Sequence, residues 1–311
     1  GKPPQDPLVA TTVDQYSIKR VIGEGGMGVV YLAQQAKPVR RRVAMKVIKA
    51  GMDSKQVIAR FQAERQALAL MNHPGIASVY EAGMTEDARP YFVMEYIEGT
   101  SITEACDAQH LDTTQRLELM AEVCDAVQHA HQKGVIHRDL KPGNILVSRG
   151  DDDRLRPTII DFGVAKATSQ DLTEMTYMTQ QGHLVGTPAY MSPEQANFEV
   201  TDQRSDIFSN GVIFAELLLG QNMFAGSDAA ESRQKIIDLP IPQFRNENEY
   251  IDLRLDAILQ KTLAHDLEIR YDSAERLMKD LEYHMYHKGY GPTNETLAKY
   301  MKELFPDKVQ A

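Results

Sequence analysis

The sequence predicts an α+β fold of two lobes: a small antiparallel β-sheet lobe with one main helix, then a larger and mostly helical lobe. Between residues 16 and 47, three segments carry the alternating or β-branched apolar residues typical of strands: "YSIKRVIG", "GVVYLAQQ" and "RRVAMKVI". After Gly99, apolar residues recur at steps of three and four, which is typical of helices. The 311 residues are enough to form two packed lobes.

The small lobe is predicted over residues 15–99, after an extended, Pro-rich lead-in at residues 1–14. A helix is expected from about residue 55 to 71, because Asp53 and Gln56 suit a capping box at its start. Two further strands, around "IASVYEAGM" and "PYFVMEYI", would complete a five-stranded antiparallel sheet.

The large lobe is predicted over residues 100–287. The segment "TTQRLELMAEVCDAVQHAHQKG" has a helical apolar stripe that ends at Gly134, and "SDIFSNGVIFAELLLG" is apolar nearly all round, as in a buried helix. Further helices are expected at about 253–264, 273–287 and 294–304. The last of these belongs to a C-terminal extension, residues 288–311, whose apolar face either packs on the large lobe or docks a partner: Leu297, Tyr300, Met301 and Leu304.

Charge and cysteine content narrow the class of protein. The net charge of −10 argues against nucleic acid as the main partner. Cys106 and Cys124 lack metal-site spacing, so a reduced, cytoplasmic protein is expected, with Cys124 in the core. The longest apolar run, "VIFAELLL", is far shorter than the ~20 residues of a membrane span, so any membrane anchor would lie outside this chain.

A glycine-rich segment, "VIGEGGMGVVYLA", points to phosphate binding. Gly23, Gly25 and Gly28 fit the spacing G-x-G-x-x-G, which also occurs in dinucleotide-binding folds. Here a second strand follows instead of a helix, so the glycines are expected at a hairpin tip whose backbone amides can approach phosphates. A flexible hairpin without a ligand is the alternative.

Lys46 lies in the middle of a strand predicted to be buried. It could simply extend to solvent. However, Glu64 falls on the apolar face of the following helix, and an inward-facing carboxylate is costly unless a cation meets it. We therefore expect Lys46 and Glu64 to pair and to hold the ammonium group against phosphate oxygens.

The segment "VIHRDLKPGNILV", residues 135–147, places charged and polar groups between two apolar stretches that resemble short buried strands. With the glycine hairpin, the "VAMK" strand, "DFG" and "GTPAYMSPE", it occurs in the order found in a protein kinase. Across residues 16–287 the chain resembles the eukaryotic-like (Hanks-type) serine/threonine protein kinases, and the wording of these motifs resembles bacterial members.

The resemblance implies roles for the polar residues of these motifs. Asp139 would be the catalytic base, and Lys141 would steady charge on the moving phosphoryl group. Asn144 and Asp161 would hold Mg²⁺, or Mn²⁺ in its place. Thr187 would bridge Asp139 and Lys141.

The resemblance also implies the nucleotide pocket and two structural contacts. Three residues would sandwich the adenine of ATP: Val30, Ala44 and Leu146. The rear of the pocket and its backbone hydrogen bonds would come from Met94, Glu95 and Ile97. His137 would pack beside Phe162, and Glu194 would pair with the buried Arg270.

The implied activity is transfer of the γ-phosphoryl group of ATP to serine or threonine hydroxyls of protein substrates. Autophosphorylation is expected in the loop after Asp161, first at Thr176 and Thr179 and next at Thr173, helped by self-association. A polar, mobile loop is the alternative. Two other functions stay open: a pseudokinase that acts as an ATP-binding scaffold, and a small-molecule phosphotransferase. The five motif residues disfavour the scaffold: Lys46, Glu64, Asp139, Asn144 and Asp161.

Overall fold

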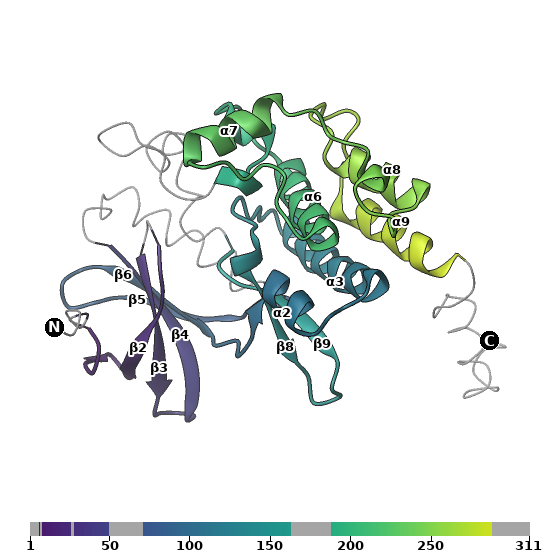
Figure 1. Cartoon of the computed structure of the whole chain (residues 1–311). Helices are drawn as coiled ribbons and strands as arrows, with labels where there is room; N and C mark the ends of the chain where they lie inside the picture. The colour runs from purple at the N-terminus through teal and green to yellow at the C-terminus, as the bar shows by residue number, and fades with distance from the viewer. Residues whose placement is uncertain (1–5, 7, 26–27, 50–70, 163–187, 288–311) are drawn as a thin grey trace, which may run out of the picture.

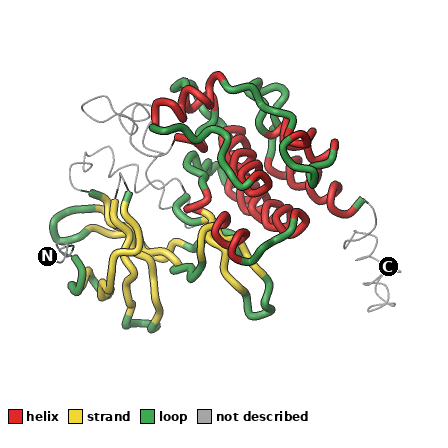
Figure 2. The backbone as a smooth tube through the Cα atoms, in the orientation of Figure 1, coloured by secondary structure: helices red, strands yellow, loops and turns green. Residues whose placement is uncertain are grey.

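The computed structural model describes residues 6, 8–25, 28–49, 71–162 and 188–287. Strands gather at one end of the molecule and helices at the other, with a short hairpin between them (Figures 1 and 2). The predicted two-lobed α+β fold is therefore confirmed.

The small lobe is built on a six-stranded antiparallel sheet with the order β1-β2-β3-β4-β6-β5. Its strands are β1 Thr12–Val13, β2 Tyr16–Glu24, β3 Gly28–Gln35, β4 Arg41–Ile48, β5 Val79–Met84 and β6 Pro90–Glu95. The prediction of five strands was wrong by one, because β1 comes from the segment expected to be an extended lead-in. The predicted helix at residues 55–71, with its capping pair, lies outside the described residues.

Residues 8–14 cover one face of this sheet. Leu8 and Val9 pack against a core that includes Val43, Met45 and Val47 from β4. Side chains alternate across a strand, so this face is opposite to the one that carries Ala44 and Lys46.

Buried tyrosines tie the same N-terminal segment to the sheet. The Tyr31 hydroxyl donates to Asp6 Oδ1 at 3.0 Å, and the Tyr91 hydroxyl donates to Asp14. Tyr31 and Tyr91 are each 1% exposed. Buried hydroxyls need such acceptors, so these carboxylates hold the segment in place.

The large lobe contains the described helices α2 Ile102–Ala108, α3 Thr113–Gln132, α5 Pro193–Ala196, α6 Gln203–Leu219, α7 Ala229–Asp238, α8 Leu253–Thr262 and α9 Ala274–Tyr286. A small antiparallel sheet joins β7 Thr100–Ser101, β8 Ile145–Arg149 and β9 Leu155–Ile159. Short 3-10 turns occur at Pro142–Asn144, Pro188–Tyr190 and Phe244–Asn246. The helices predicted around α3, α6, α8 and α9 are present, whereas α2, α7 and β9 were not predicted.

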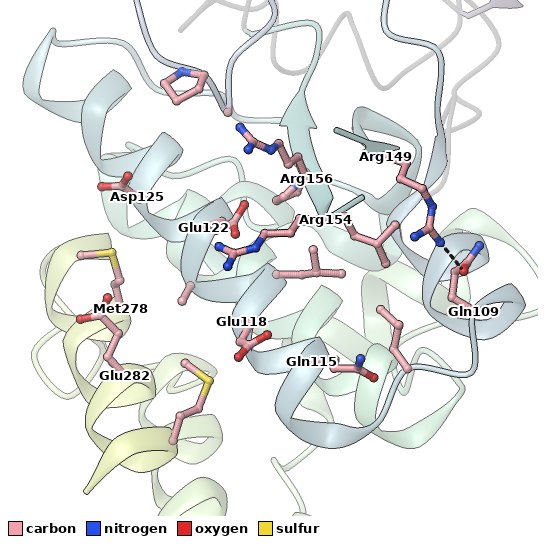
Figure 3. Close-up of a pocket in the computed structure, with 18 of the residues that line it drawn as sticks. Gln109, Gln115, Glu118, Glu122, Asp125, Arg149, Arg154, Arg156, Met278 and Glu282 are labelled. Atoms are coloured by element: carbon pink, nitrogen blue, oxygen red, sulfur yellow. Dashed lines mark hydrogen bonds between the residues drawn. The ribbon is translucent and has the colours of Figure 1, made fainter. Parts of the chain in front are cut away.

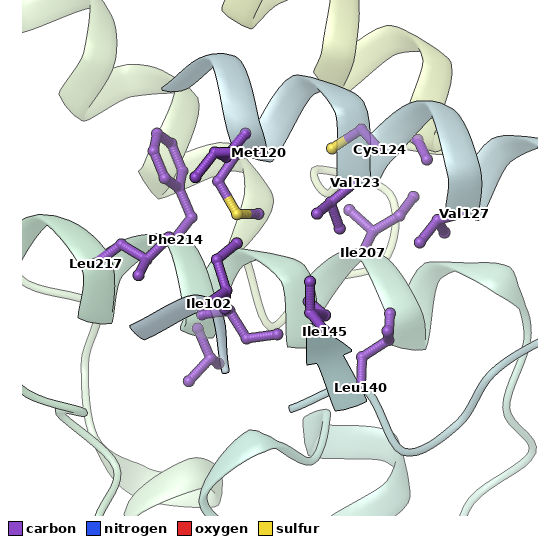
Figure 4. Close-up of a cluster of buried hydrophobic side chains, with 14 of the residues drawn as sticks. Ile102, Met120, Val123, Cys124, Val127, Leu140, Ile145, Ile207, Phe214 and Leu217 are labelled. Carbon is purple, nitrogen blue, oxygen red and sulfur yellow. The ribbon is translucent and has the colours of Figure 1, made fainter. Parts of the chain in front are cut away.

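The large-lobe core forms where α3 packs against α6 (Figure 4). Met120 and Cys124 on α3 face Ile207 and Phe214 on α6. Cys124 is buried as predicted, and both cysteines are free thiols. Helix α6 ends at Gly220, whose φ of 75° is the left-handed conformation that glycine adopts without strain.

Two further predictions concern the apolar stretches beside residues 137–144 and the helix at residues 294–304. Of the two apolar stretches that flank residues 137–144, the second forms β8, but residues 135 and 136 are not in a strand. The Val135 amide instead donates to Ala130 O at the end of α3. The helix predicted at residues 294–304 lies outside the described residues.

Candidate active site

The ammonium group of Lys46 contacts both carboxylate oxygens of Asp161, at 2.6 and 2.5 Å. Lys46 is in β4 between β3 and β6, opposite Val30 and Phe92, and is 8% exposed. A buried ammonium group needs an anionic partner, and Asp161 supplies one from a segment 115 residues away. The predicted partner, Glu64, lies outside the described residues, so that pairing stays a prediction.

Asp139, Lys141 and Asn144 lie together in the loop between α3 and β8. Lys141 Nζ is 3.1 Å from Asp139 Oδ2, and Asn144 Nδ2 donates to Asp139 O at 2.8 Å. Because the amide nitrogen of Asn144 is used in this way, its Oδ1 oxygen points elsewhere and can accept a cation.

The loop and the Asp161 segment are also joined through the backbone. The amide of Ile160 donates to Asn144 O at 2.9 Å. Hydrogen bonds and ion pairs thus connect Lys46, Asp161, Asn144, Asp139 and Lys141 in one continuous arrangement. The structure therefore brings these five predicted residues together.

Two residues of this site have a strained backbone. Arg138 and Asp161 each have a φ of 62°, a region that non-glycine residues rarely adopt. Such conformations persist where surrounding contacts enforce them, and they are frequent at functional sites.

Asp206 enforces the conformation at Arg138. Its carboxylate accepts hydrogen bonds from the backbone amides of His137 at 2.8 Å and Arg138 at 2.7 Å, and it lies 2.8 Å from His131 Nε2. Gln195 holds the other side of the turn, because its Nε2 donates to Arg138 O at 2.9 Å.

The Asp206 side chain is completely buried. Burial alone would raise its pKa, but the bonds from His131 and from the loop outweigh burial and hold the pKa below its usual value. Asp206 was not predicted as a site residue. The available signal was a carboxylate near the start of a helix that is mostly apolar.

His137 fills a structural position. Its ring centroid is 4.8 Å from that of Phe162, and Nε2 lies 3.1 Å from Ile160 O. The predicted packing beside Phe162 is confirmed, and these contacts leave the ring at the floor of the loop.

Glu194 and Arg270 form the predicted ion pair. Their two contacts are 2.8 and 3.2 Å long, and both side chains are buried. Burial would raise the pKa of Glu194, but Arg270 and the Ser205 hydroxyl lower it below its usual value. The pair fixes the segment that follows the "GTPAY" motif to the large lobe.

The glycines lie where β2 passes into β3, as the hairpin prediction requires. Gly25 N donates to Gly28 O at 2.9 Å, and the next element is a strand. A Cβ atom on Gly28 would be 2.5 Å from Val47 O, so no side chain fits there. The bare backbone at this position follows from the close approach of β4.

The residues predicted to bind adenine lie on the inner face of the sheet and on β8. Ala44 and Met94 are buried partners across β4 and β6, and Val30 packs on the same core. Leu146 is a half-buried residue of β8. Their role in nucleotide binding stays a prediction.

The backbone contacts expected from Glu95 and Ile97 are at the end of β6. The expected contacts are the Glu95 carbonyl and the Ile97 amide; the Glu95 amide donates to Ser78 O at 2.8 Å and takes no part in them. Ile97 follows the strand and is half-buried. Thr187 and the predicted phosphorylation sites lie outside the described residues.

In the described residues, no helix combines the length and the apolar character that a membrane span requires.

Comparisons with known proteins agree with this geometry. Serine/threonine-protein kinase PknB of Mycobacterium leprae is 36% identical over 277 residues, covering 86% of this chain and 42% of that protein. Serine/threonine-protein kinase PrkC of Bacillus subtilis is 34% identical over 270 residues, covering 86% of this chain and 40% of that protein. The chain therefore spans less than half the length of these curated relatives.

A solved structure shares the fold. The kinase domain of Mycobacterium tuberculosis PknI has a TM-score of 0.67 at 25% identity, covering 89% of this chain and 98% of that one. Residues 16–282 match the family described as the protein kinase domain. The chain belongs to the protein kinase family, and bacterial serine/threonine-protein kinases are among its relatives.

Proposed function

We propose that this chain transfers the γ-phosphoryl group of ATP to serine or threonine hydroxyls of proteins. The observation that carries the proposal is the continuous arrangement from Lys46 and Asp161 through Asn144 to Asp139 and Lys141. Phosphoryl transfer needs positioned charges more than covalent chemistry, and this arrangement supplies both signs of charge at one place.

Asp139 is assigned the role of proton acceptor in the reaction. As the substrate hydroxyl oxygen bonds to phosphorus and the bond to ADP breaks, the hydroxyl proton passes to this carboxylate. Lys141 Nζ lies 3.1 Å from Asp139 Oδ2. Its proposed role is to offset the negative charge of the phosphoryl group during transfer.

Lys46 and the glycine hairpin are proposed to bind the remaining phosphates of ATP. Lys46 is fixed on β4 by strands on both sides, and glycines at positions 23, 25 and 28 lie in the segment where β2 passes into β3. Both features suit a polyanion that must be held without blocking its terminal group.

Asn144 and Asp161 fit a hard divalent cation. An amide oxygen and a carboxylate are the oxygen ligands that Mg²⁺ prefers, with further positions taken by water and phosphate oxygens. The bound Mg²⁺, or Mn²⁺, would neutralise phosphate charge. The chain's own part is to fix both ligands, through Asn144 Nδ2 on Asp139 O and through Lys46 on Asp161.

A transfer assay tests the function. The chain is incubated with γ-labelled ATP, Mg²⁺ and a generic protein acceptor, beside the Asp139→Asn variant, and the labelled amino acids are identified. We expect label on serine and threonine, lost on chelation of the metal and reduced by about 10²–10⁴-fold in the variant. Equal inertness of both proteins despite ATP binding would favour the scaffold, and label on small molecules alone would favour the phosphotransferase.

Autophosphorylation is a separate part of the proposal. Thr176 and Thr179, then Thr173, are the expected sites, and self-association would let one copy modify another. Mixing active chain with an Asp139→Asn copy of different mass tests this by phosphopeptide mapping. Label on the inactive copy supports transfer between chains, and a clean loop in an active enzyme contradicts the proposal.

We also assign this domain to the cytoplasm. Cys106 and Cys124 are buried free thiols, which suits a reducing compartment. Burial raises the pKa of Cys106 to about 11, so this thiol stays protonated at neutral pH.

A further inference from the structure

A second concave site lies on the large lobe, away from the proposed transfer site. It is a groove of about 1040 Å³ between α3, α9 and the β8–β9 hairpin (Figure 3). Its lining includes none of Lys46, Asp139, Asn144 and Asp161. The kinase reaction therefore leaves this groove without a role.

The floor of the groove is apolar. Leu119 and Ala121 of α3 are buried beneath it, and four partly buried side chains line it: Leu111, Leu155, Met278 and Met285. These residues come from α3, α9, β9 and the turn before α3. An apolar floor of this kind favours an apolar occupant over water.

Charged side chains of both signs surround this floor. Acidic residues project from α3 and α9, and the hairpin carries arginines together with Asp153: Glu118, Glu122, Asp125, Glu282, Arg149, Arg154 and Arg156. In Figure 3 the side chains of Arg154 and Arg156 extend from the hairpin toward Glu122. An occupant that fits must present an apolar face to the floor and polar or charged side chains to this rim.

This chain contains such a segment, and it begins beside the groove. Tyr286 lines the groove at the end of α9, and residues 288–311 follow directly. The first six of them, "KGYGPT", contain two glycines and a proline, which favour a reversal of chain direction.

The next residues, "NETLAKYMKEL" (294–304), have apolar side chains at helical spacing: Leu297, Tyr300, Met301 and Leu304. In a helix, Glu303 falls beside this face, whereas Lys299 and Lys302 fall on the opposite side of the helix. The segment would be about 16 Å long as a helix at 1.5 Å per residue. It therefore has an apolar face to set against the apolar floor of the groove, with its lysines turned outward.

We propose that residues 294–304 dock in this groove of their own chain as an amphipathic helix. Docking would affect the proposed transfer site, because the β8–β9 hairpin under the docked segment connects the two proposed metal ligands, Asn144 and Asp161. Strand β8 begins one residue after Asn144, and β9 ends two residues before Asp161. The docked segment would brace the hairpin that positions both ligands.

Hydrogen exchange of the full chain tests the proposal. The double variant Leu297→Asp with Met301→Asp removes two apolar contacts, and each change lowers the docking equilibrium by about tenfold or more. The matched control is Lys299→Gln with Lys308→Gln, which changes the net charge by the same amount away from the apolar face. We expect faster exchange in residues 113–132 and 145–159 for the first variant alone. Equal exchange in all three proteins would overturn the proposal.

Cross-linking identifies the occupant independently of exchange. Arg154→Cys and Lys302→Cys place one thiol on the hairpin and one on the segment, for reaction with a short bismaleimide at low protein concentration. A link within one chain supports the proposal, and Leu297→Asp with Met301→Asp should abolish it. The controls carry one introduced cysteine each beside the buried Cys106 and Cys124. Links exclusively between chains would assign the groove to a second copy, and no link above these controls would leave it to another protein; either result overturns the proposal. Neither readout depends on phosphoryl transfer, so the proposed kinase activity stands or fails separately.

Discussion

The substitution Asp206→Asn replaces only one oxygen by an NH₂ group, but it should strongly destabilise the large lobe. The Asp206 carboxylate is buried and accepts from His131, His137 and Arg138. Its pKa is lowered despite burial, so the folded protein favours the ionised form. The asparagine removes the charge and places an NH₂ group against N–H donors.

The cost follows from these contacts. Hydrogen bonds to a charged acceptor contribute about 1.5–3 kcal/mol each, and a buried donor left without an acceptor costs about 1–3 kcal/mol. Weakening three bonds and leaving one donor unmatched gives a loss of about 3–5 kcal/mol in the free energy of unfolding. That is a large share of the ~5–15 kcal/mol typical of a folded protein.

Urea unfolding followed by far-UV circular dichroism measures the loss, since the chain has no tryptophan. The matched control is Asp202→Asn on the same helix, where the side chain accepts from Arg204 N at the helix start. Asparagine caps a helix as well as aspartate does, so the control should change by about 1 kcal/mol or less. Equal losses in the two variants would refute the reasoning about Asp206.

The remaining predictions concern two other buried contacts. Arg270→Met leaves Glu194 buried without its cation and should cost about 3–5 kcal/mol, measured by urea unfolding; an unchanged midpoint would contradict this. Because the pKa of Glu194 is lowered in the folded protein, the pair's contribution is complete above about pH 4.3 and is lost as pH falls through the lower folded value. Stability measured from pH 7 downward should therefore fall in acid, and fall less in Arg270→Met. Tyr31→Phe removes the bond to Asp6 and should cost about 1–2 kcal/mol, against no measurable change for the more exposed Tyr80→Phe; equal effects would show that residues 6–14 do not support the sheet.

The sequence was most informative where local signals were strong. Helix α6 was predicted over 205–220 and runs from Gln203 to Leu219, because a long apolar run ends at a glycine. The strands on either side of the glycine hairpin were likewise predicted from their alternating apolar residues. Asp139 and Asp161 were identified because each lies inside a motif of distinctive composition.

Elements and contacts without a local signal were missed. Helix α2 has only 7 residues, and β1 is a two-residue strand in a Pro-rich segment. Asp206 meets His131 and Arg138 across 75 and 68 residues. No periodicity encodes such a contact, because it exists only once the helices have packed.

The most direct test of the account separates nucleotide binding from transfer in one preparation. Affinity for Mg²⁺-ATP and the rate of phosphorylation of a serine/threonine protein acceptor are measured for the wild type and for Asp139→Asn. We expect the variant to keep its affinity within about tenfold while its rate falls by about 10²–10⁴-fold. A variant that transfers phosphate at the wild-type rate would contradict the assignment of Asp139 as proton acceptor, and with it the proposed transfer site.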